Sequence, residues 1–258
     1  MLDSSQKTRT QVYAHRGFAA RAPENTLPAF ALAIEVGADG IEFDVQMTVD
    51  GELIVIHDDT LDRTTDGSGQ VAHQTLHDLR RLDAGSWFAP EFAGVRVPTL
   101  DEVLALAVEA PYPVMLNLEL KYGDTPYPAL EFRAWERVSA YGLGARTIVS
   151  SFYHEPLRRL KRAHAEAETA LLYQDGLVDP WLYAHYLGAG ALHPYYKSVT
   201  AEQIAQIRQQ GVKVRVYTVD DEDDLRRFCR WGVDAVITEH PDLALRISSA
   251  STLSRVNR

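Results

Sequence analysis

The sequence predicts an α/β protein that folds as a TIM (β/α)8 barrel, with a small insertion after the second strand region. Short apolar segments of strand length alternate with helical segments along most of the 258 residues, and such repeated βα units form a parallel sheet. About eight units can be counted, which is the number that closes a barrel, and a barrel of this kind needs roughly 250 residues. An open doubly wound sheet is the alternative fold. No Gly-x-Gly-x-x-Gly motif follows the first strand, which disfavours a dinucleotide-binding sheet.

The first strand and helix have clear sequence signals. A strand is expected at residues 12–14, and Asn25 or Thr26 is expected to cap a helix that ends near Gly37. The second strand is expected at residues 38–45, where apolar and acidic side chains alternate. These segments form the first unit of the barrel and the strand that follows it.

The regular alternation lapses between residues 59 and 97. This stretch is rich in turn-forming residues, such as the run Arg63 to Gly69, and a structureless connection of that length is improbable inside a compact domain. We therefore predict a small folded insertion or lid at residues 59–97. The apolar strand just before it, at residues 53–56, is either an extension of the second strand or an extra strand.

Strands and helices alternate again from residue 99 to the end of the fold. Further strands are expected at residues 113–121, 147–150, 170–173, 191–193, 212–219 and 234–238. Helices are expected to begin after Thr99 and to span about 129–141, 155–164, 181–186, 200–210, 221–231 and 241–248. The barrel is thus expected to span residues 12–248 as one catalytic domain, with flexible termini at residues 1–11 and 249–258.

The composition limits the class of partner. Lysine and arginine total 26 against 36 aspartate and glutamate residues, a formal net charge of −10, so the chain lacks the excess positive charge that general nucleic-acid binding requires. A small phosphate ligand held by a few local cations is compatible with this charge. Cys229 is the only cysteine, which excludes an intrachain disulfide, and we expect it to be a buried helix residue.

The sequence has no signal for secretion or for crossing a membrane. Residues 1–11 are polar and lack the apolar segment of a signal peptide. No uninterrupted apolar run approaches the length of about 18 residues that a membrane span needs. We therefore expect a cytoplasmic protein without stable membrane insertion, and its oligomeric state stays open.

Three acids fall on the inward faces of predicted strands. Glu42 and Asp44 share one face of the strand at residues 38–45, and Glu119 is placed similarly on a later strand. Both faces of a barrel strand are buried, so carboxylates there need a cation or a proton. Each acid alone could pair with an arginine or face solvent. The three together favour a site for one hard divalent cation, Mg²⁺ or Ca²⁺, which prefers oxygen ligands.

Two histidines and two cations follow strands that end at the same mouth of the barrel. His15 and His57 each come directly after an apolar strand, and histidine is a natural general acid or base because it titrates near neutral pH. Either could instead be a hydrogen-bonded residue at a strand end. Arg16 and Lys121 suit a phosphoryl group, the arginine through its bidentate fork and the lysine as a point charge. Ion pairs with the acids are the alternative for both cations and can coexist with function.

A series of short motifs runs in order from about residue 12 to 247. The motifs are His15-Arg16-Gly17, Ala22-Pro23-Glu24-Asn25-Thr26, Gly37 to Val45 with Thr48 and Asp50-Gly51, Val55-Ile56-His57-Asp58, Leu61-x-Arg63-Thr64-Thr65, Gly85 to Phe88, Pro98-Thr99-Leu100, Leu118-Glu119-Leu120-Lys121, Tyr217-Thr218-Val219 and Gly232 to Thr238. In this order they resemble the glycerophosphodiester phosphodiesterase family. Any single motif is weak, whereas the ordered set is highly specific.

The resemblance implies a TIM barrel with an insertion and the hydrolysis of glycerophosphodiesters, such as glycerophosphocholine and glycerophosphoethanolamine, to sn-glycerol 3-phosphate and an alcohol. It also implies that the glycerol 2-hydroxyl is an internal nucleophile and that the reaction passes through a cyclic phosphate, since an attached hydroxyl has a large effective concentration. The implied roles are one divalent cation held by Glu42, Asp44 and Glu119, acid/base catalysis by His15 and His57, and phosphate contact by Arg16 and Lys121.

Two positions depart from the family pattern. Tyr217 stands where the family usually has the tryptophan of Val-Trp-Thr-Val, and we expect it to bind substrate. Its smaller, hydroxylated ring either alters how the glycerol end is packed or simply adds a hydrogen bond. Glu239 stands where an aspartate is common. We expect neither position to touch the metal ligands or the histidines, so both bear on specificity alone.

Two other functions are compatible with these residues. A barrel phosphodiesterase that acts on a lipid, a lysophospholipase D or a phospholipase C-like enzyme, would share the histidines and the metal. The sequence has no obvious apolar or basic membrane-docking segment, which favours a small soluble diester as the partner. A non-catalytic phosphate-binding protein on the same scaffold predicts the loss of a histidine or a metal acid, and none is missing.

Overall fold

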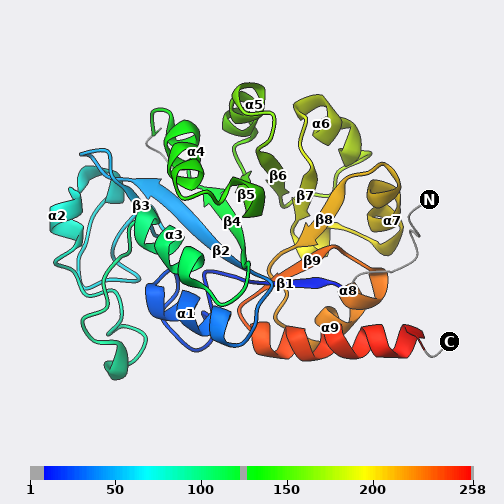
Figure 1. Ribbon diagram of the computed structural model, residues 1–258, viewed down its shortest axis with the longest axis horizontal. Helices are drawn as coiled ribbons and strands as arrows, with labels where there is room; N and C mark the ends of the chain where they lie inside the picture. Colours follow the sequence, from blue (N-terminus) through cyan, green and yellow to red (C-terminus); the bar gives the residue numbers. More distant parts are fainter. Residues whose placement is uncertain (1–8, 123–126, 257–258) are drawn as a thin grey trace.

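The protein is a closed barrel of parallel strands surrounded by helices (Figure 1). The structure, a computed structural model, describes residues 9–122 and 127–256, the last six of them by their backbone alone. The barrel strands are β1 (Gln11–Ala14), β2 (Gly40–Met47), β4 (Met115–Leu120), β5 (Thr147–Ser151), β6 (Glu168–Tyr173), β7 (Ala191–Pro194), β8 (Lys213–Val216) and β9 (Ala235–Thr238). Because β1 pairs with both β2 and β9, the sheet closes on itself, which confirms the predicted TIM barrel and excludes the open sheet.

The outer layer consists of helices that connect successive strands and of a final helix after the last strand. They are α1 (Leu27–Glu35), α3 (Leu100–Glu109), α4 (Leu130–Ala140), α5 (His154–Ala163), α6 (Pro180–Leu187), α7 (Ala201–Gln209), α8 (Glu222–Trp231) and α9 (Pro241–Val256), with short 3-10 turns η3 (Gly144–Arg146) and η4 (Tyr196–Ser198). Their apolar faces pack on the outward faces of the strands, as where Phe30 of α1 meets Phe43 of β2 edge to face at 5.9 Å. Among the described residues, no helix combines the length and apolar composition needed to cross a bilayer.

The predicted helix caps are confirmed in one case and corrected in another. Thr99 caps α3 in a full capping box with Glu102. Thr26 occupies the cap position of α1, but its side chain does not cap the helix, and the side chain of Asn25 donates instead to the Asp44 carboxylate at 2.7 Å. The side chain of Asn25 therefore contacts the strand that carries the acids instead of capping the helix.

The residues between β2 and α3 fold into a small substructure beside the barrel (Figure 1). Strand β3 (Leu53–Val55) pairs antiparallel with the end of β2, so it is an extra strand outside the barrel. After it come η1 (Val71–His73), α2 (Leu76–Leu79) and η2 (Pro90–Phe92). This segment has its own apolar core of Ile54, Ile56, Leu61, Val71, Leu79, Ala84 and Val97. The domain limits and the idea of a moving lid stay predictions.

The ends of two elements differ from those predicted. Helix α9 continues to Val256, past the predicted end at residue 248, because no glycine or proline follows Ser248 to stop it. Strand β8 ends at Val216, and Tyr217 makes only a single bridge to Tyr195. Of the termini expected to be flexible, residues 1–8 and 257–258 lie outside the described residues, and flexibility of the rest stays a prediction.

The loop after β1 packs directly on the backbone of α1. Gly17 has a φ of 82°, and a Cβ atom there would lie 2.7 Å from the carbonyl carbon of Ala29. Only glycine combines that left-handed backbone with such a close approach. This packing fixes the loop that carries His15 and Arg16 at the end of β1.

The variant Gly17→Ala should destabilise the protein more than Gly37→Ala. The two glycines have φ values of 82° and 81°, so each substitution costs about 1–2 kcal/mol for the left-handed backbone. Only at Gly17 would the new methyl group clash with Ala29, which adds roughly 1–3 kcal/mol, because nothing lies within 4 Å at Gly37. Chemical denaturation measures both losses, and equal losses would contradict the need for the close approach.

Candidate active site

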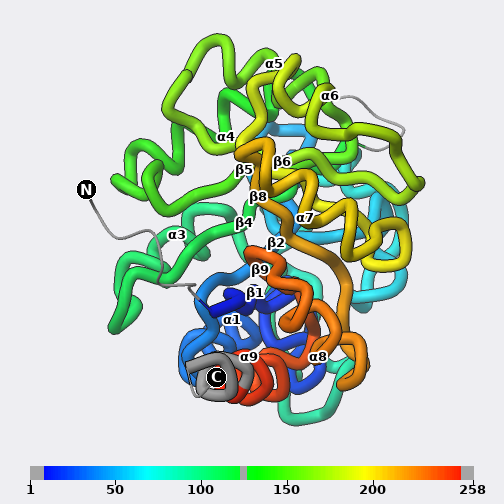
Figure 2. The backbone as a smooth tube through the Cα atoms, turned by 90° about the vertical axis from the view of Figure 1, so that its right-hand side faces the viewer, coloured from blue at the N-terminus to red at the C-terminus, as the bar shows by residue number. Residues whose placement is uncertain are grey.

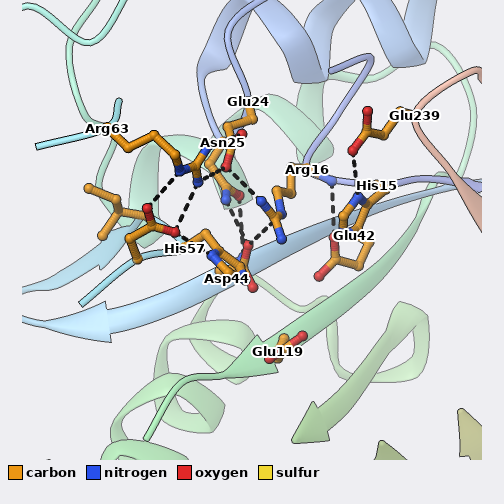
Figure 3. A network of polar contacts seen from close by, with 12 residues as sticks. His15, Arg16, Glu24, Asn25, Glu42, Asp44, His57, Arg63, Glu119 and Glu239 are labelled. Carbon is orange, nitrogen blue, oxygen red and sulfur yellow. Dashed lines mark hydrogen bonds and ion pairs between the residues drawn. The ribbon is translucent and has the colours of Figure 1, made fainter. Parts of the chain in front are cut away.

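The three predicted metal ligands meet at the carboxyl end of the barrel. The parallel register of β2 and β4 places Asp44 beside Glu119 and Glu42 beside Asn117, so all three acids share the inward face. One carboxylate oxygen from each acid lies within 4.8 Å of the other two, and all three side chains are buried (Figure 3). The cluster could therefore hold a metal ion, as the sequence predicts.

Burial and mutual repulsion govern the ionisation of this cluster. Burial, together with the charges of Asp44 and Glu119, raises the pKa of Glu42 well above its usual range. Burial also raises the pKa of Glu119, although Lys121 opposes the shift. The pKa of Asp44 is lowered despite its burial, because Lys121 and Arg16 stabilise its charge. An all-oxygen donor set with negative charge in excess of its cations fits a hard divalent ion such as Mg²⁺ or Ca²⁺.

Both predicted phosphate-binding cations lie against the acids. Lys121 Nζ is 2.9 Å from a Glu119 oxygen and 3.6 Å from an Asp44 oxygen. Arg16 Nε is 3.5 Å from an Asp44 oxygen, and the Arg16 backbone N–H donates to the Glu42 carboxylate at 2.9 Å. The ion pairs that were the alternative for these cations are thus present. The same two side chains also place positive charge at the mouth.

His15 lies between two carboxylates. Its Nε2 atom is 3.9 Å from a Glu42 oxygen, and its Nδ1 atom is 3.5 Å from a Glu239 oxygen (Figure 3). The contact with His15 also lowers the pKa of Glu239. The prediction that Glu239 would not touch the histidines is therefore wrong. Glu239 follows β9, and closure of the barrel brings β9 beside β1, far apart in the sequence (Figure 2).

His57 is held by its neighbour in the chain. Its Nδ1 atom is 2.6 Å from an Asp58 oxygen, and since a carboxylate can only accept, Nδ1 carries the proton of the neutral ring. The Gln46 side-chain amide lies 3.1 Å and 2.8 Å from the carbonyl oxygens of His57 and Asp58. These contacts fix both the ring and the backbone of this histidine.

Several residues at the mouth were not predicted to belong to the site. Four of them lie in motifs identified in the sequence, and Gln46 and Glu239 each follow a motif directly, but the motifs alone did not show what the side chains contact. They are Glu24, Asn25, Gln46, Asp58, Arg63 and Glu239.

Tyr217 directly follows β8 and lies among other aromatic residues. Its hydroxyl donates to the Tyr173 carbonyl at 3.1 Å, and its ring meets Phe152 edge to face at 5.9 Å. Burial and the charge of Glu119 raise the pKa of Tyr217, so the hydroxyl stays protonated as a donor. The hydroxyl of Tyr217 thus adds a hydrogen bond within the protein, whereas an effect on the packing of the glycerol end and contact with substrate stay predictions.

An oxygen-rich buried cluster with two histidines and two cations at the carboxyl end of a TIM barrel is typical of hydrolases that act on phosphate esters. Comparison with known proteins narrows this class. Residues 15–243 match the glycerophosphoryl diester phosphodiesterase family. A glycerophosphodiester phosphodiesterase of Caldanaerobacter subterraneus subsp. tengcongensis is 43% identical over 93% of this chain and 98% of its own length. One from Bacillus subtilis is 36% identical over 91% of this chain and 85% of its own length.

Solved structures agree with these relatives. A phosphodiesterase of Oleispira antarctica, in complex with the product sn-glycerol-3-phosphate, superposes with a TM-score of 0.83 at 31% identity, over 93% of this chain and 96% of that one. A glycerophosphodiester phosphodiesterase of Agrobacterium tumefaciens gives 0.79 at 33% identity, over 92% and 99%. The chain belongs to the glycerophosphoryl diester phosphodiesterase family, as the motifs predict, and glycerophosphodiester phosphodiesterase activity follows from this membership.

A divalent cation should stabilise the folded protein against heat, and more at about pH 7.5 than at about pH 5. Glu42 and Glu119 have raised pKa values, so the folded state binds protons more readily than the unfolded state, and stability falls as pH rises through those values. A bound cation replaces the protons, so its effect grows with pH. At about 100 times its Kd, it adds roughly 2.7 kcal/mol.

Thermal melts with and without Mg²⁺ or Ca²⁺ measure this effect. Glu119→Gln should reduce the cation-induced shift strongly. Glu131→Gln is the matched control, because Glu131 is also a buried carboxylate but pairs with Arg159 and Tyr122 and is not one of the three clustered acids. An identical shift in wild type and Glu119→Gln would rule out this site for the cation.

Proposed function

We propose that this enzyme hydrolyses soluble glycerophosphodiesters, such as glycerophosphocholine and glycerophosphoethanolamine, to sn-glycerol 3-phosphate and an alcohol in a metal-dependent reaction. The observation that carries the proposal is the buried triad of Glu42, Asp44 and Glu119 with a histidine on either side. The bound product of the Oleispira antarctica structure supports the substrate class. The reaction is assigned to the carboxyl end of the barrel, where these residues meet.

The triad would hold one divalent cation, Mg²⁺ or Ca²⁺. When bound there, the ion would polarise the phosphoryl oxygens and lower the pKa of the attacking hydroxyl. Arg16 and Lys121 would contact the phosphate, since each is already at the mouth and partly neutralised by the acids. Tyr217 would pack on the glycerol end with its ring, because its hydroxyl is engaged with the Tyr173 carbonyl.

The two histidines would share the proton transfers. One accepts the proton of the glycerol 2-hydroxyl as its oxygen attacks phosphorus, and the other donates a proton to the alcohol oxygen as the P–O bond to it breaks. Water then opens the resulting cyclic phosphate and yields sn-glycerol 3-phosphate. The pairing of His57 Nδ1 with Asp58 leaves Nε2 as the lone-pair nitrogen for such a transfer. The Nδ1 atom of His15 faces Glu239 at the longer distance of 3.5 Å.

The purified protein should release sn-glycerol 3-phosphate from both glycerophosphocholine and glycerophosphoethanolamine. A chelator should abolish the reaction and added Mg²⁺ or Ca²⁺ should restore it, because the carboxylates alone cannot polarise the phosphate. A coupled assay for sn-glycerol 3-phosphate measures both effects. Turnover that persists after complete metal removal would contradict the metal dependence. Inactivity on soluble diesters together with turnover of lysophospholipids would favour a lipid phosphodiesterase.

His15→Ala and His57→Ala should each lower kcat by roughly 10²- to 10⁴-fold, because each removes a proton-transfer group. Steady-state kinetics with glycerophosphocholine measure the loss, and circular dichroism checks the fold. His154→Ala is the control, since this histidine begins α5 and binds the Leu172 carbonyl instead of the carboxylates. A histidine variant that folds normally and keeps the wild-type kcat would remove that residue from the mechanism.

A further inference from the structure

We infer that Arg63 is a positioning residue that ties the His57–Asp58 pair to the Arg16–Glu24 pair, so that the inserted segment acts as a fixed support for the active site. This inference rests on the proposed function, because it assigns Arg63 its effect through His57 and Arg16. It gives the segment at residues 59–97 a task in the reaction that differs from that of a moving lid.

Four hydrogen bonds carry the inference. Arg63 Nε and Nη2 donate to the two oxygens of Asp58 at 2.6 Å and 2.9 Å. Arg63 Nη1 and Nη2 donate to the two oxygens of Glu24 at 2.7 Å and 2.8 Å. The planar guanidinium of Arg63 therefore binds two carboxylates, those of Asp58 and Glu24, that come from different loops. Figure 3 shows Arg63 beside Glu24. Lysine has the same charge but cannot reproduce this fork.

Each of these carboxylates touches a residue proposed for the reaction. Asp58 accepts from His57 Nδ1 at 2.6 Å, and Glu24 accepts from Arg16 Nη1 at 2.8 Å. Without Arg63, Asp58 could rotate away from His57, and the proton of the neutral ring would no longer be fixed on Nδ1. Glu24 would likewise lose the partner that holds it in place beside Arg16. Through Asp58, Arg63 would affect proton transfer by His57, and through Glu24 it would affect phosphate binding by Arg16.

The inserted segment holds Arg63 in position. Leu61 is buried in the small core of the segment, and its carbonyl accepts from both the backbone N–H and the hydroxyl of Thr65, at 3.1 Å and 2.8 Å. Arg63 lies within this closed turn. The apolar core on one side and the ion pairs on the other therefore fix the arginine between them.

The test compares Arg63→Met with Asp58→Asn and Glu24→Gln, using glycerophosphocholine as substrate. Arg63→Met should lower kcat by roughly 10- to 100-fold and also raise KM. Asp58→Asn should reproduce mainly the loss of kcat, and Glu24→Gln mainly the rise of KM. Arg63→Lys should recover part of both losses, because it restores the charge without the fork. The double variant Arg63→Met with Asp58→Asn should lose no more kcat than Asp58→Asn alone.

Arg80→Met is the matched control. Arg80 also comes from the inserted segment and makes a bidentate pair, with Glu102 at 2.7 Å and 2.8 Å, at a similar exposure of 38% against 44% for Arg63. It should lower stability without changing kcat or KM. If Arg63→Met changes the kinetics no more than Arg80→Met, or if the losses of Arg63→Met and Asp58→Asn multiply, the inference is overturned.

A second measurement does not depend on turnover. Nitrogen-15 NMR of the histidine rings, with His57 assigned by its absence from His57→Gln, reports which ring nitrogen carries the proton. Wild type and Arg80→Met should keep the proton on Nδ1, whereas Arg63→Met should show exchange between the two nitrogens. An unchanged His57 signal in Arg63→Met would overturn the inference. Inactive wild type with the expected NMR change would instead sink the proposed function and leave the role of Arg63 in place.

Discussion

Three carboxylates buried at one end of a barrel are the constraint on which the rest of the site depends. An isolated buried carboxylate is costly, and three that repel each other cost more, so the surrounding chain has to supply compensating charge. It does so from the nearest positions, with Arg16 just after β1 and Lys121 just after β4. The backbone N–H of Arg16 adds a further donor to Glu42. The features that make the cluster tolerable also make the mouth suited to a cation and an anion together.

The mouth is divided into two chemically different sides. Charged residues follow or belong to β9, β1, β2, β3 and β4, whereas aromatic residues follow β5, β7 and β8. There the ring of Tyr217 contacts those of Phe152 and Tyr195, at 5.9 Å and 6.2 Å. The charged side has the chemistry that suits a phosphate group, and the aromatic side has the chemistry that suits the organic substituents of a phosphodiester. The division arises from the order of strands around the ring, since neighbours in the sequence are neighbours in the barrel.

The sequence predicts the barrel, most of its helices and the meeting of the three acids, because the periodicity of each strand is a local property and parallel barrel strands end at the same mouth. Glu42 and Asp44 are two residues apart, so they occupy the same face of β2, and the register of β2 with β4 places Glu119 beside Asp44. Contacts made through closure or through the inserted segment are not local. Glu239 beside His15 and Arg63 between Glu24 and Asp58 therefore required the structure. Asn25 was assigned to the wrong partner because helix caps and site ligands favour the same side chains.

The pairing of β1 with β9 has a consequence for how the protein is made. During synthesis β1 emerges well before β9, so for on the order of ten seconds, at about 5–20 residues per second, the sheet has two unpaired edges. Such edges can recruit other chains, and protection by chaperones is most useful in this interval. His15 also has no Glu239 beside it until the last strand docks. A ribosome-bound chain that stops short of β9 thus carries nearly all the residues of the site but lacks Glu239 and the strand that closes the barrel.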